Sequence, residues 1–179
     1  MQKHGKIRFF QVDVTSKADL SSAVDYIAQE SGHVNLVVAN SGIVGPSVLE
    51  LTKEASLMDF RKYLLGADVD EFNHTFAVNT TAVFYIVVAF LDLLDKGNKV
   101  GNIKQRSQVI AVSSICAYSR VPIAGYAYGS SKAAVVHMMK QFATTLAPYE
   151  IRSNVLAPGG ELLSFGRDLS LKVFLLTSK

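Results

Sequence analysis

The sequence predicts an α/β protein with an open, doubly wound parallel sheet. Four short runs are nearly continuous in apolar residues, which is typical of parallel strands covered on both faces. Helical patterns separate these runs, and strands that alternate with helices imply right-handed βαβ units. Small polar residues follow each run, where the loops of such a sheet meet. The four predicted strands are IRFFQV from Ile7, VNLVVA from Val34, SQVIAVS from Ser107 and IRSNVLA from Ile151.

The composition is that of one globular domain. Of the 179 residues, 49% are hydrophobic and 18% are charged. The net charge is +3 and the basic residues are scattered, so neither nucleic acid nor an acidic membrane is an expected partner. The single cysteine, Cys116, cannot form an internal disulfide, and the histidines lack metal-ligand spacing, so no metal is expected. No apolar signal segment opens the sequence, and we expect a reducing, cytoplasmic location.

The first predicted helix covers residues 16 to 31. Its apolar residues recur on one face, Ser16 and Asp19 have the spacing of a capping box, and Gly32 closes the end. A weaker helical pattern lies within Lys53 to Leu65, and a long helix is predicted from Tyr126 to Ala147, where Pro148 ends it.

A further long helix is predicted from Val69 to Asp95. Within it, the run from Phe76 to Leu94 approaches the length of a membrane span. Asn79 and Asp92 are among the polar residues that interrupt the run, so we expect a buried or subunit-packing helix instead of a membrane-spanning one.

The predicted strand ends carry the residues suited to a ligand crevice. The first ends in Asp13, the second in Asn40-Ser41-Gly42, the third in Ser113-Ser114 and the fourth in Pro158-Gly159-Gly160. In open α/β sheets, ligands bind beyond the carboxyl ends of the strands. Ordinary turn chemistry is the alternative, because glycine, serine and asparagine are also common turn formers.

Tyr128 and Lys132 form the strongest chemical signal. They are four residues apart on a predicted helix, so the phenol and the ammonium share one face. A neighbouring cation favours phenolate and lowers the pKa of the phenol toward use as a general acid or base. Ser114, or Ser113 in its place, offers a hydroxyl that holds a carbonyl or alcohol oxygen beside the phenol. Alternatively, the pair arises by chance, with the ring packed and the lysine solvated.

With these residues, the chain resembles the short-chain dehydrogenase/reductase family from about Lys6 to about Gly160. Ser114, Tyr128 and Lys132 match the family's catalytic serine, tyrosine and lysine. Asn79, within FAVNTTAVF, matches the asparagine that holds a water in the family's proton relay. The resemblance implies a Rossmann-like fold and NAD(P)-dependent interconversion of a small-molecule carbonyl and an alcohol, in which Tyr128 passes the proton.

The resemblance also implies a set of cofactor contacts. Asp13 with Val14 resembles the acidic position that contacts the adenine ring. Asn40-Ser41-Gly42 resembles the family's Asn-Ala-Gly turn beside the cofactor, and Pro158-Gly159 resembles the turn beside the nicotinamide. Lys132, next to Tyr128, would also hold the nicotinamide ribose.

Each of these residues has a plainer interpretation. Asp13 would only cap the turn after its strand. Asn79 would only satisfy backbone groups inside a buried helix, because a buried amide needs partners. Cys116 is a small buried side chain rather than a nucleophile.

One expected element of the family is not found in the sequence. The 179 residues contain no G-x-G-x-x-G, no related glycine-rich turn and no G-x-x-x-x-G-K. The strand at Ile7 then corresponds to the family's third, and the strand at Val34 becomes an apolar sheet edge. We expect residues 1–179 to form a single partial NAD(P)-binding Rossmann-fold domain, with a divergent C-terminal tail at 161–179.

The prediction is therefore a fragment or shortened isoform of an NAD(P)-dependent oxidoreductase that is inactive alone. NAD(P) binding by these residues is doubtful because the phosphate-binding turn is not among them. The alternative is a non-enzymatic partner of a full-length relative. Dimerisation would use the two long helices, Val69 to Asp95 and Tyr126 to Ala147, and a homo-oligomer is expected.

Overall fold

A parallel three-stranded sheet is the centre of the fold in the computed structural model, which describes residues 6–52, 54–122, 124–159 and 175–177. The strand order is β2 (Leu36–Ala39), β3 (Gln108–Val112) and β4 (Arg152–Leu156). Val37 lies opposite Val109, and Ile110 lies opposite Asn154. The predicted α/β class with a parallel sheet is confirmed.

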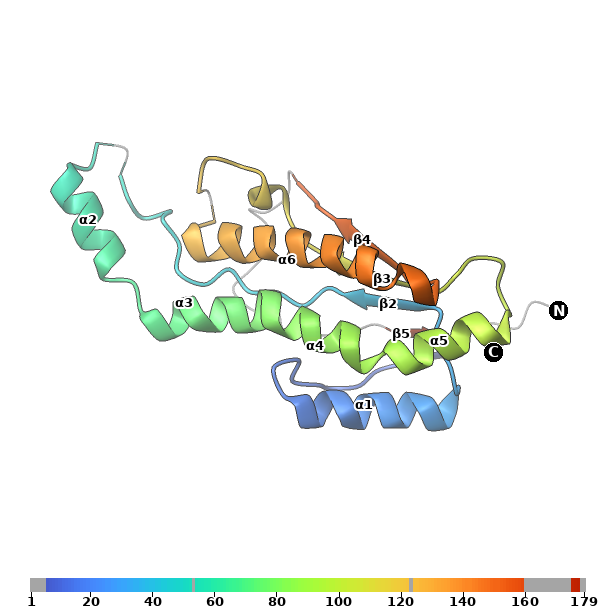
Figure 1. Cartoon of the computed structure of the whole chain (residues 1–179). Coiled ribbons are helices and arrows are strands. Elements are labelled where there is room, and N and C mark those ends of the chain that lie inside the picture. The colour runs from blue at the N-terminus through green and yellow to red at the C-terminus, as the bar shows by residue number, and fades with distance from the viewer. Residues whose placement is uncertain (1–5, 53, 123, 160–174, 178–179) are drawn as a thin grey trace.

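Three helices form a layer against this sheet, with α4 (Ala82–Ala89) between α1 (Lys17–Glu30) and α6 (Tyr126–Thr145) in Figure 1. Their apolar faces meet the buried side chains of β2 and β3 in one core. Fully buried members of this core include Val37, Ile86, Leu94, Val109, Val135 and Met139. Burying side chains of this size stabilises a fold by roughly 1.5 to 3 kcal/mol each before conformational entropy is counted.

Helix α1 begins where the sequence predicts. The amide of Asp19 donates to Oγ of Ser16 at 3.2 Å, and the Ser16 hydroxyl donates to the Asp19 carboxylate at 2.8 Å. Leu20 and Ile27 are buried on the inner face. The cap therefore fixes the start of the helix, and the apolar stripe fixes which side faces the core.

The prediction of one continuous helix from Val69 to Asp95 is wrong. The segment consists of α3 (Val69–Phe76), a π-helical turn (Ala77–Thr81), α4 and then α5 (Leu91–Val100). The axis bends by 45° before α5. Leu93 and Leu94 are buried, so the bend keeps the apolar side of α5 on the core.

No individual helix of the described residues has the length and apolarity needed to cross a membrane. The segments Val69–Ala89 and Leu91–Val100 reach those criteria only when taken together across their bend.

The strand predicted at Ile7 is also different. It is limited to β1 (Lys6–Arg8), and it pairs antiparallel with β5 (Leu175–Thr177) outside the three-stranded sheet. Farther along the predicted strand, the ring of Phe10 packs edge-on against Tyr26 of α1, with centroids 4.4 Å apart. Side-chain packing on α1 thus replaces the strand ladder after Arg8.

Coverage of both sheet faces was expected from the apolar runs, and among the described residues only one face is fully covered. Burial alternates along β2 and β3, with Val37 and Val109 buried while Leu36 and Ile110 are half-buried. On β4, Leu156 is exposed. The alternation has the period of two expected when the described helices pack on a single side.

Two shorter features complete the description. Helix α2 (Leu57–Leu65) stands away from the sheet in Figure 1, and it begins with a capping box between Ser56 and Asp59. Helix α6 ends at Thr145, two residues before the predicted end, and a 3-10 turn at Ala147–Tyr149 contains Pro148. Most of the predicted tail at 161–179, together with Gly160, lies outside the described residues.

Candidate functional site

The candidate site lies where the end of β3 meets the first two turns of α6. Tyr128 and Lys132 share one face of the helix, and Nζ of Lys132 lies over the tyrosine ring, 5.8 Å from its centroid. Ser113 and Ser114 follow β3 directly and are buried. The three residue types that the sequence pattern predicts are therefore brought together.

The two serines occupy different positions. Oγ of Ser113 donates to the backbone carbonyl of Lys132 at 2.8 Å, which ties the strand end to the helix. The Ser114 side chain is near enough to the Tyr128 phenol to lower the pKa of that phenol, and it accepts from the amide of Cys116 at 3.2 Å. The geometry favours Ser114 over Ser113 as the serine that would meet a substrate oxygen.

The pKa of Tyr128 is raised, opposite to the predicted direction. Burial is the largest cause, because it penalises the phenolate; the hydrogen bond with Ser114 lowers the pKa and the Cys116 thiol raises it. The ammonium of Lys132 lies over the ring face. The phenol is thus protonated at neutral pH, in the form that donates a proton to a carbonyl oxygen.

Lys132 is almost fully buried. Burial lowers its pKa to about 8, and Nζ donates to the backbone carbonyl of Val112 at 2.8 Å. A buried ammonium with one backbone partner retains further N–H donors. These donors are available to a hydroxyl-bearing ligand such as a ribose.

Asn79 anchors the loop after β2 from the π-helical turn. Its Oδ1 accepts from the amide of Ile43 at 2.8 Å, and its Nδ2 donates to the Ile43 carbonyl at 2.9 Å and to Oγ of Ser131 at 3.0 Å. The plainer interpretation, that a buried amide satisfies backbone groups, is therefore what the contacts show. A role in a proton relay stays a prediction.

The Asp13 side chain caps the turn that follows it. Its carboxylate accepts from the amide and the hydroxyl of Thr15, at 2.8 and 2.7 Å. These hydrogen bonds lower the pKa of the fully exposed carboxyl. Val14 is buried in the core, so its side chain packs inside the fold. Contact of Asp13 with an adenine ring stays a prediction.

The loop after β2 packs closely against Lys132 and Asn79. Among the described residues, the buried hydroxyl of Ser41 has no hydrogen-bond partner. A Cβ at Gly42 would lie 3.0 Å from Nζ of Lys132 and 3.2 Å from Oδ1 of Asn79, so glycine lets this loop approach the lysine. Asn40 is exposed beside it. The predicted Asn40-Ser41-Gly42 turn thus adjoins the lysine predicted to hold the ribose.

The fourth strand end lies on the same side. The amide of Ile115, next to Ser114, donates to the carbonyl of Pro158 at 2.9 Å. Gly159 adjoins the Ile115 side chain, and both Pro158 and Gly159 are exposed. The predicted turn beside the nicotinamide is therefore held next to the candidate serine.

Sequence pattern alone does not single out the partners of Asn79. Oγ of Ser131 donates to the carbonyl of Tyr128 at 2.8 Å, and Oγ1 of Thr80 donates to the carbonyl of Ser131 at 3.0 Å. From sequence, Ser131 is only a small residue on a helix. The available signal is that two polar residues, Asn79 and Ser131, stand on otherwise apolar helix faces.

Metal chemistry has no support in this geometry. Across the ranges that the structure describes, no group of three or more histidine, cysteine, aspartate or glutamate side chains is placed to hold a metal ion.

Fold and site together define a class. A parallel α/β sheet with a half-buried tyrosine and a buried lysine in Tyr-x-x-x-Lys spacing, beside a strand-end serine, is the arrangement of a Rossmann-like dehydrogenase or reductase. The family model described as short chain dehydrogenase matches residues 1–165. The chain belongs to the short-chain dehydrogenase/reductase family.

Curated relatives agree with this assignment. The chain is 50% identical over 157 residues to short-chain dehydrogenase/reductase PhomF′ of Diaporthe leptostromiformis, covering 88% of this chain and 54% of the relative. It is 45% identical over 163 residues to short-chain dehydrogenase/reductase SAT3 of Stachybotrys chartarum, covering 83% and 60%. Cyclopentanol dehydrogenase of a Comamonas species is 30% identical over 155 residues, with 87% and 53% covered. The chain spans about half the length of the curated relatives it matches.

Solved structures share the fold. A short-chain type dehydrogenase/reductase from Mycobacterium marinum superposes with a TM-score of 0.65 at 27% identity, covering 83% of this chain and 50% of the other. The RhlG/NADP active-site complex of Pseudomonas aeruginosa gives a TM-score of 0.66 at 24% identity, covering 83% and 51%. The second likeness supports the fold alone.

Proposed function

We propose that the chain carries the reaction half of an NAD(P)-dependent oxidoreductase that interconverts a carbonyl and an alcohol. The placement of the Ser114 side chain beside the Tyr128 phenol, with Lys132 buried over the same ring, is the observation that carries this proposal. Family membership supports it.

The chain's own side chains handle the oxygen and the proton. In the reducing direction, Tyr128 donates its phenolic proton to the substrate oxygen as the carbonyl becomes an alcohol, and Ser114 holds that oxygen beside the phenol. The nearby ammonium of Lys132 stabilises the phenolate left behind. NAD(P), when bound, supplies or accepts the hydride. Asn79 keeps the loop carrying Gly42 in place, and its position permits a role in returning the proton through water.

The proposed cofactor contacts divide into three groups. Asn40, Ser41, Gly42 and Lys132 would hold the ribose side, Pro158 and Gly159 the nicotinamide side, and Asp13 with Val14 the adenine side. A glycine-rich phosphate-binding turn is not among the 179 residues. We therefore propose that these residues by themselves do not catalyse the reaction. Activity would require a glycine-rich phosphate-binding turn supplied by further residues. Cys116 is a free thiol, which suits a reducing compartment, and we propose that this activity is cytoplasmic.

The test uses these residues joined to the glycine-rich N-terminal segment of a relative. We expect oxidation of NADH or NADPH with a cyclic ketone such as cyclopentanone, chosen because cyclopentanol dehydrogenase is a relative. Tyr128→Phe should lower kcat at least a hundredfold, because removing a general acid typically costs that much or more. Tyr126→Phe makes the same change on an exposed tyrosine two residues away and should leave turnover intact. Equal activity of both variants would overturn the assignment.

A second candidate function is dimerisation with a full-length relative. On the outer side of α4, Phe84 and Val88 are 41% and 42% exposed, and Phe84 stacks on Phe142 of α6 at 5.9 Å. An apolar patch across α4 and α6 suits subunit packing. Co-expression with a relative followed by size-exclusion chromatography tests it: a mixed dimer that Phe84→Glu disrupts supports pairing, and elution of separate chains contradicts it.

A further inference from the structure

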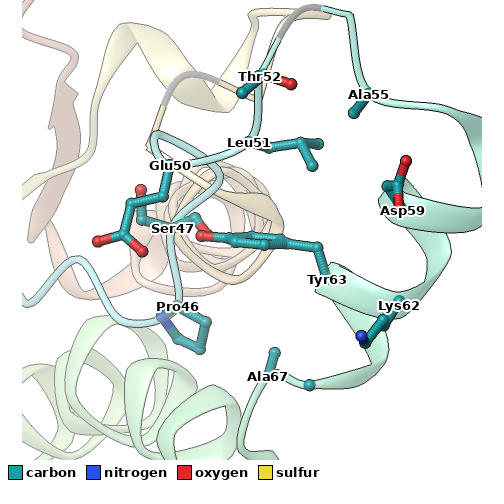
Figure 2. A pocket seen from close by; sticks show the side chains of 11 residues that line it. Pro46, Ser47, Glu50, Leu51, Thr52, Ala55, Asp59, Lys62, Tyr63 and Ala67 are labelled. Atoms are coloured by element: carbon teal, nitrogen blue, oxygen red, sulfur yellow. The ribbon is translucent and has the colours of Figure 1, made fainter.

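A hollow lies between the segment that follows β2 and helix α2. Its volume is about 650 Å³, within the roughly 300 to 1,000 Å³ of ordinary small-molecule sites. Figure 2 shows Tyr63 reaching across it toward Ser47, with Leu51 and Ala55 on one side and Pro46 and Ala67 on the other.

The hollow has walls held by specific contacts. The Tyr63 hydroxyl donates to the carbonyl of Ser47 at 3.2 Å, which links α2 to the opposite wall. The Ser56 hydroxyl donates to the Asp59 carboxylate at 2.6 Å, and the Asp59 amide returns a bond to Ser56, so α2 has a fixed start. The aromatic ring of Tyr63 is thereby placed as one wall of the hollow.

The hollow adjoins the helix that carries the proposed acid. Gly125, immediately before α6, has φ of +89°, and a Cβ there would lie 2.1 Å from the carbonyl oxygen of Pro46. Only glycine permits this approach of the two backbones. Tyr128 follows three residues later in the first turn of α6, so the wall at Pro46 and Ser47 contacts the start of the helix that carries Tyr128.

The lining has a definite chemical character. Pro46, Leu51, Ala55, Ala67 and the ring of Tyr63 present apolar surface. The charged lining residues Glu50 and Lys62 are exposed. The Asp59 carboxylate is already engaged by Ser56. Such a surface favours a rigid apolar body over a flexible or strongly charged one.

We infer that this hollow, with Tyr63 as its specificity-determining wall, binds the apolar ring system of a polycyclic ketone or alcohol whose reacting oxygen lies at Tyr128. The inference rests on the proposed function and names its substrate class. Small ketones reach Tyr128 without filling the hollow, so Tyr63 governs selection by size.

Saturation-transfer NMR on the purified chain tests the inference, with trans-1-decalone as the bicyclic probe and acetone as the small one. We expect decalone to bind, and Tyr63→Ala to weaken its Kd about tenfold, the usual scale for losing apolar pocket contacts. Tyr149→Ala makes the same change on an exposed tyrosine beyond the far end of α6 and should leave Kd unchanged. Ala67→Leu fills the hollow without removing a contact, so it keeps the test valid where Tyr63→Ala fails to fold.

The outcomes separate this inference from the proposed function. Loss of decalone binding in Tyr63→Ala or Ala67→Leu, with binding retained in Tyr128→Phe, supports the hollow as a ring site. Absence of decalone binding to the wild-type chain, or equal binding by all pocket variants, overturns it even where a small ketone is turned over. Decalone binding at the hollow together with undiminished turnover by Tyr128→Phe in the joined chain contradicts the proposed function and leaves the ring site standing.

Discussion

The reaction site and the region around α2 are stabilised by different kinds of contact. We call residues 44–52 and 54–67 the α2 lobe; it meets the start of α6 where Pro46 approaches Gly125. Around Tyr128, buried polar side chains join three elements: Ser113 binds the backbone of α6, and Asn79 binds both the loop at Ile43 and Ser131. Helix α6 buries six residues, whereas α2 buries none. The site is fixed by buried contacts, while the lobe depends on caps and on Tyr63.

The different contacts of the two regions match their different proposed functions. Acid–base chemistry needs groups held to within a fraction of an ångström, which buried and fully bonded side chains provide. Recognition of substrates of different size tolerates a wall that opens at low free-energy cost. Substitutions in the two regions should therefore differ in both magnitude and kind.

The largest effect on stability is expected from Asn79→Ala. The substitution leaves the amide and carbonyl of Ile43 without their partner, and the Ser131 hydroxyl keeps only its bond to the Tyr128 carbonyl. Each unsatisfied buried group costs roughly 1 to 3 kcal/mol, so we expect the free energy of unfolding to fall by about 3 to 5 kcal/mol. Urea denaturation measures it. Asn154→Ala, on the exposed side of β4, is the control and should cost under about 1 kcal/mol; similar losses at both positions would remove the distinction between the regions.

Lys132→Met should stabilise the chain at neutral pH while abolishing the proposed chemistry. The pKa of Lys132 is about 8 in the fold against 10.5 ordinarily, so burying its charge at pH 7 costs about 3 kcal/mol. Loss of the bond to Val112 offsets about 1 kcal/mol, which leaves a net gain of about 2 kcal/mol.

The stability difference between Lys132→Met and the wild type should depend on pH. Between about pH 8 and 10.5 the unfolded chain binds more protons at this lysine than the folded chain, so the contribution of Lys132 to stability rises with pH. The advantage of Lys132→Met should therefore shrink as pH increases through this window. Urea denaturation at pH 7 and pH 9.5 measures it, and a variant less stable than wild type at both values would contradict burial of the ammonium.

The smallest expected change in stability comes from removing helix caps, and it should differ between α1 and α2. Ser16→Ala removes the cap of α1, which packs Leu20 and Ile27 in the core, and should lower the free energy of unfolding by about 1 kcal/mol. Ser56→Ala removes the same cap from α2 and should change global unfolding by less than about 0.5 kcal/mol, because α2 opens locally first. Hydrogen exchange in α2 should accelerate about fivefold instead. Equal global losses would show that the lobe unfolds together with the core.

Much of the site follows from sequence because it depends on spacing. A separation of four on a helix places Lys132 over the Tyr128 ring, and the end of an apolar strand places Ser114 beside them. The parallel sheet follows from the same apolar runs. Local patterns of this kind survive tertiary packing because burial and helix periodicity reinforce them.

The remaining features depend on contacts distant in sequence. The π-helical turn at Ala77–Thr81 occurs where Asn79 bonds to Ile43, 36 residues away, and helix periodicity carries no sign of it. The raised pKa of Tyr128 follows from burial that only the folded chain defines. The hollow at Tyr63 forms between a weakly patterned helix and a loop, and the approach of that loop to α6 depends on Gly125.

The central claim is that Tyr128 and Ser114 act as one hydrogen-bonded unit at the end of β3. NMR titration of the chain labelled with ¹³C at the tyrosine ζ carbon, in wild type and in Ser114→Ala, measures it most directly. We expect the Tyr128 pKa to lie above 10.0 in the wild type, because burial raises it, and to rise further in Ser114→Ala, because the serine hydrogen bond lowers it. A Tyr128 pKa that does not respond to loss of the Ser114 hydroxyl would contradict the claim.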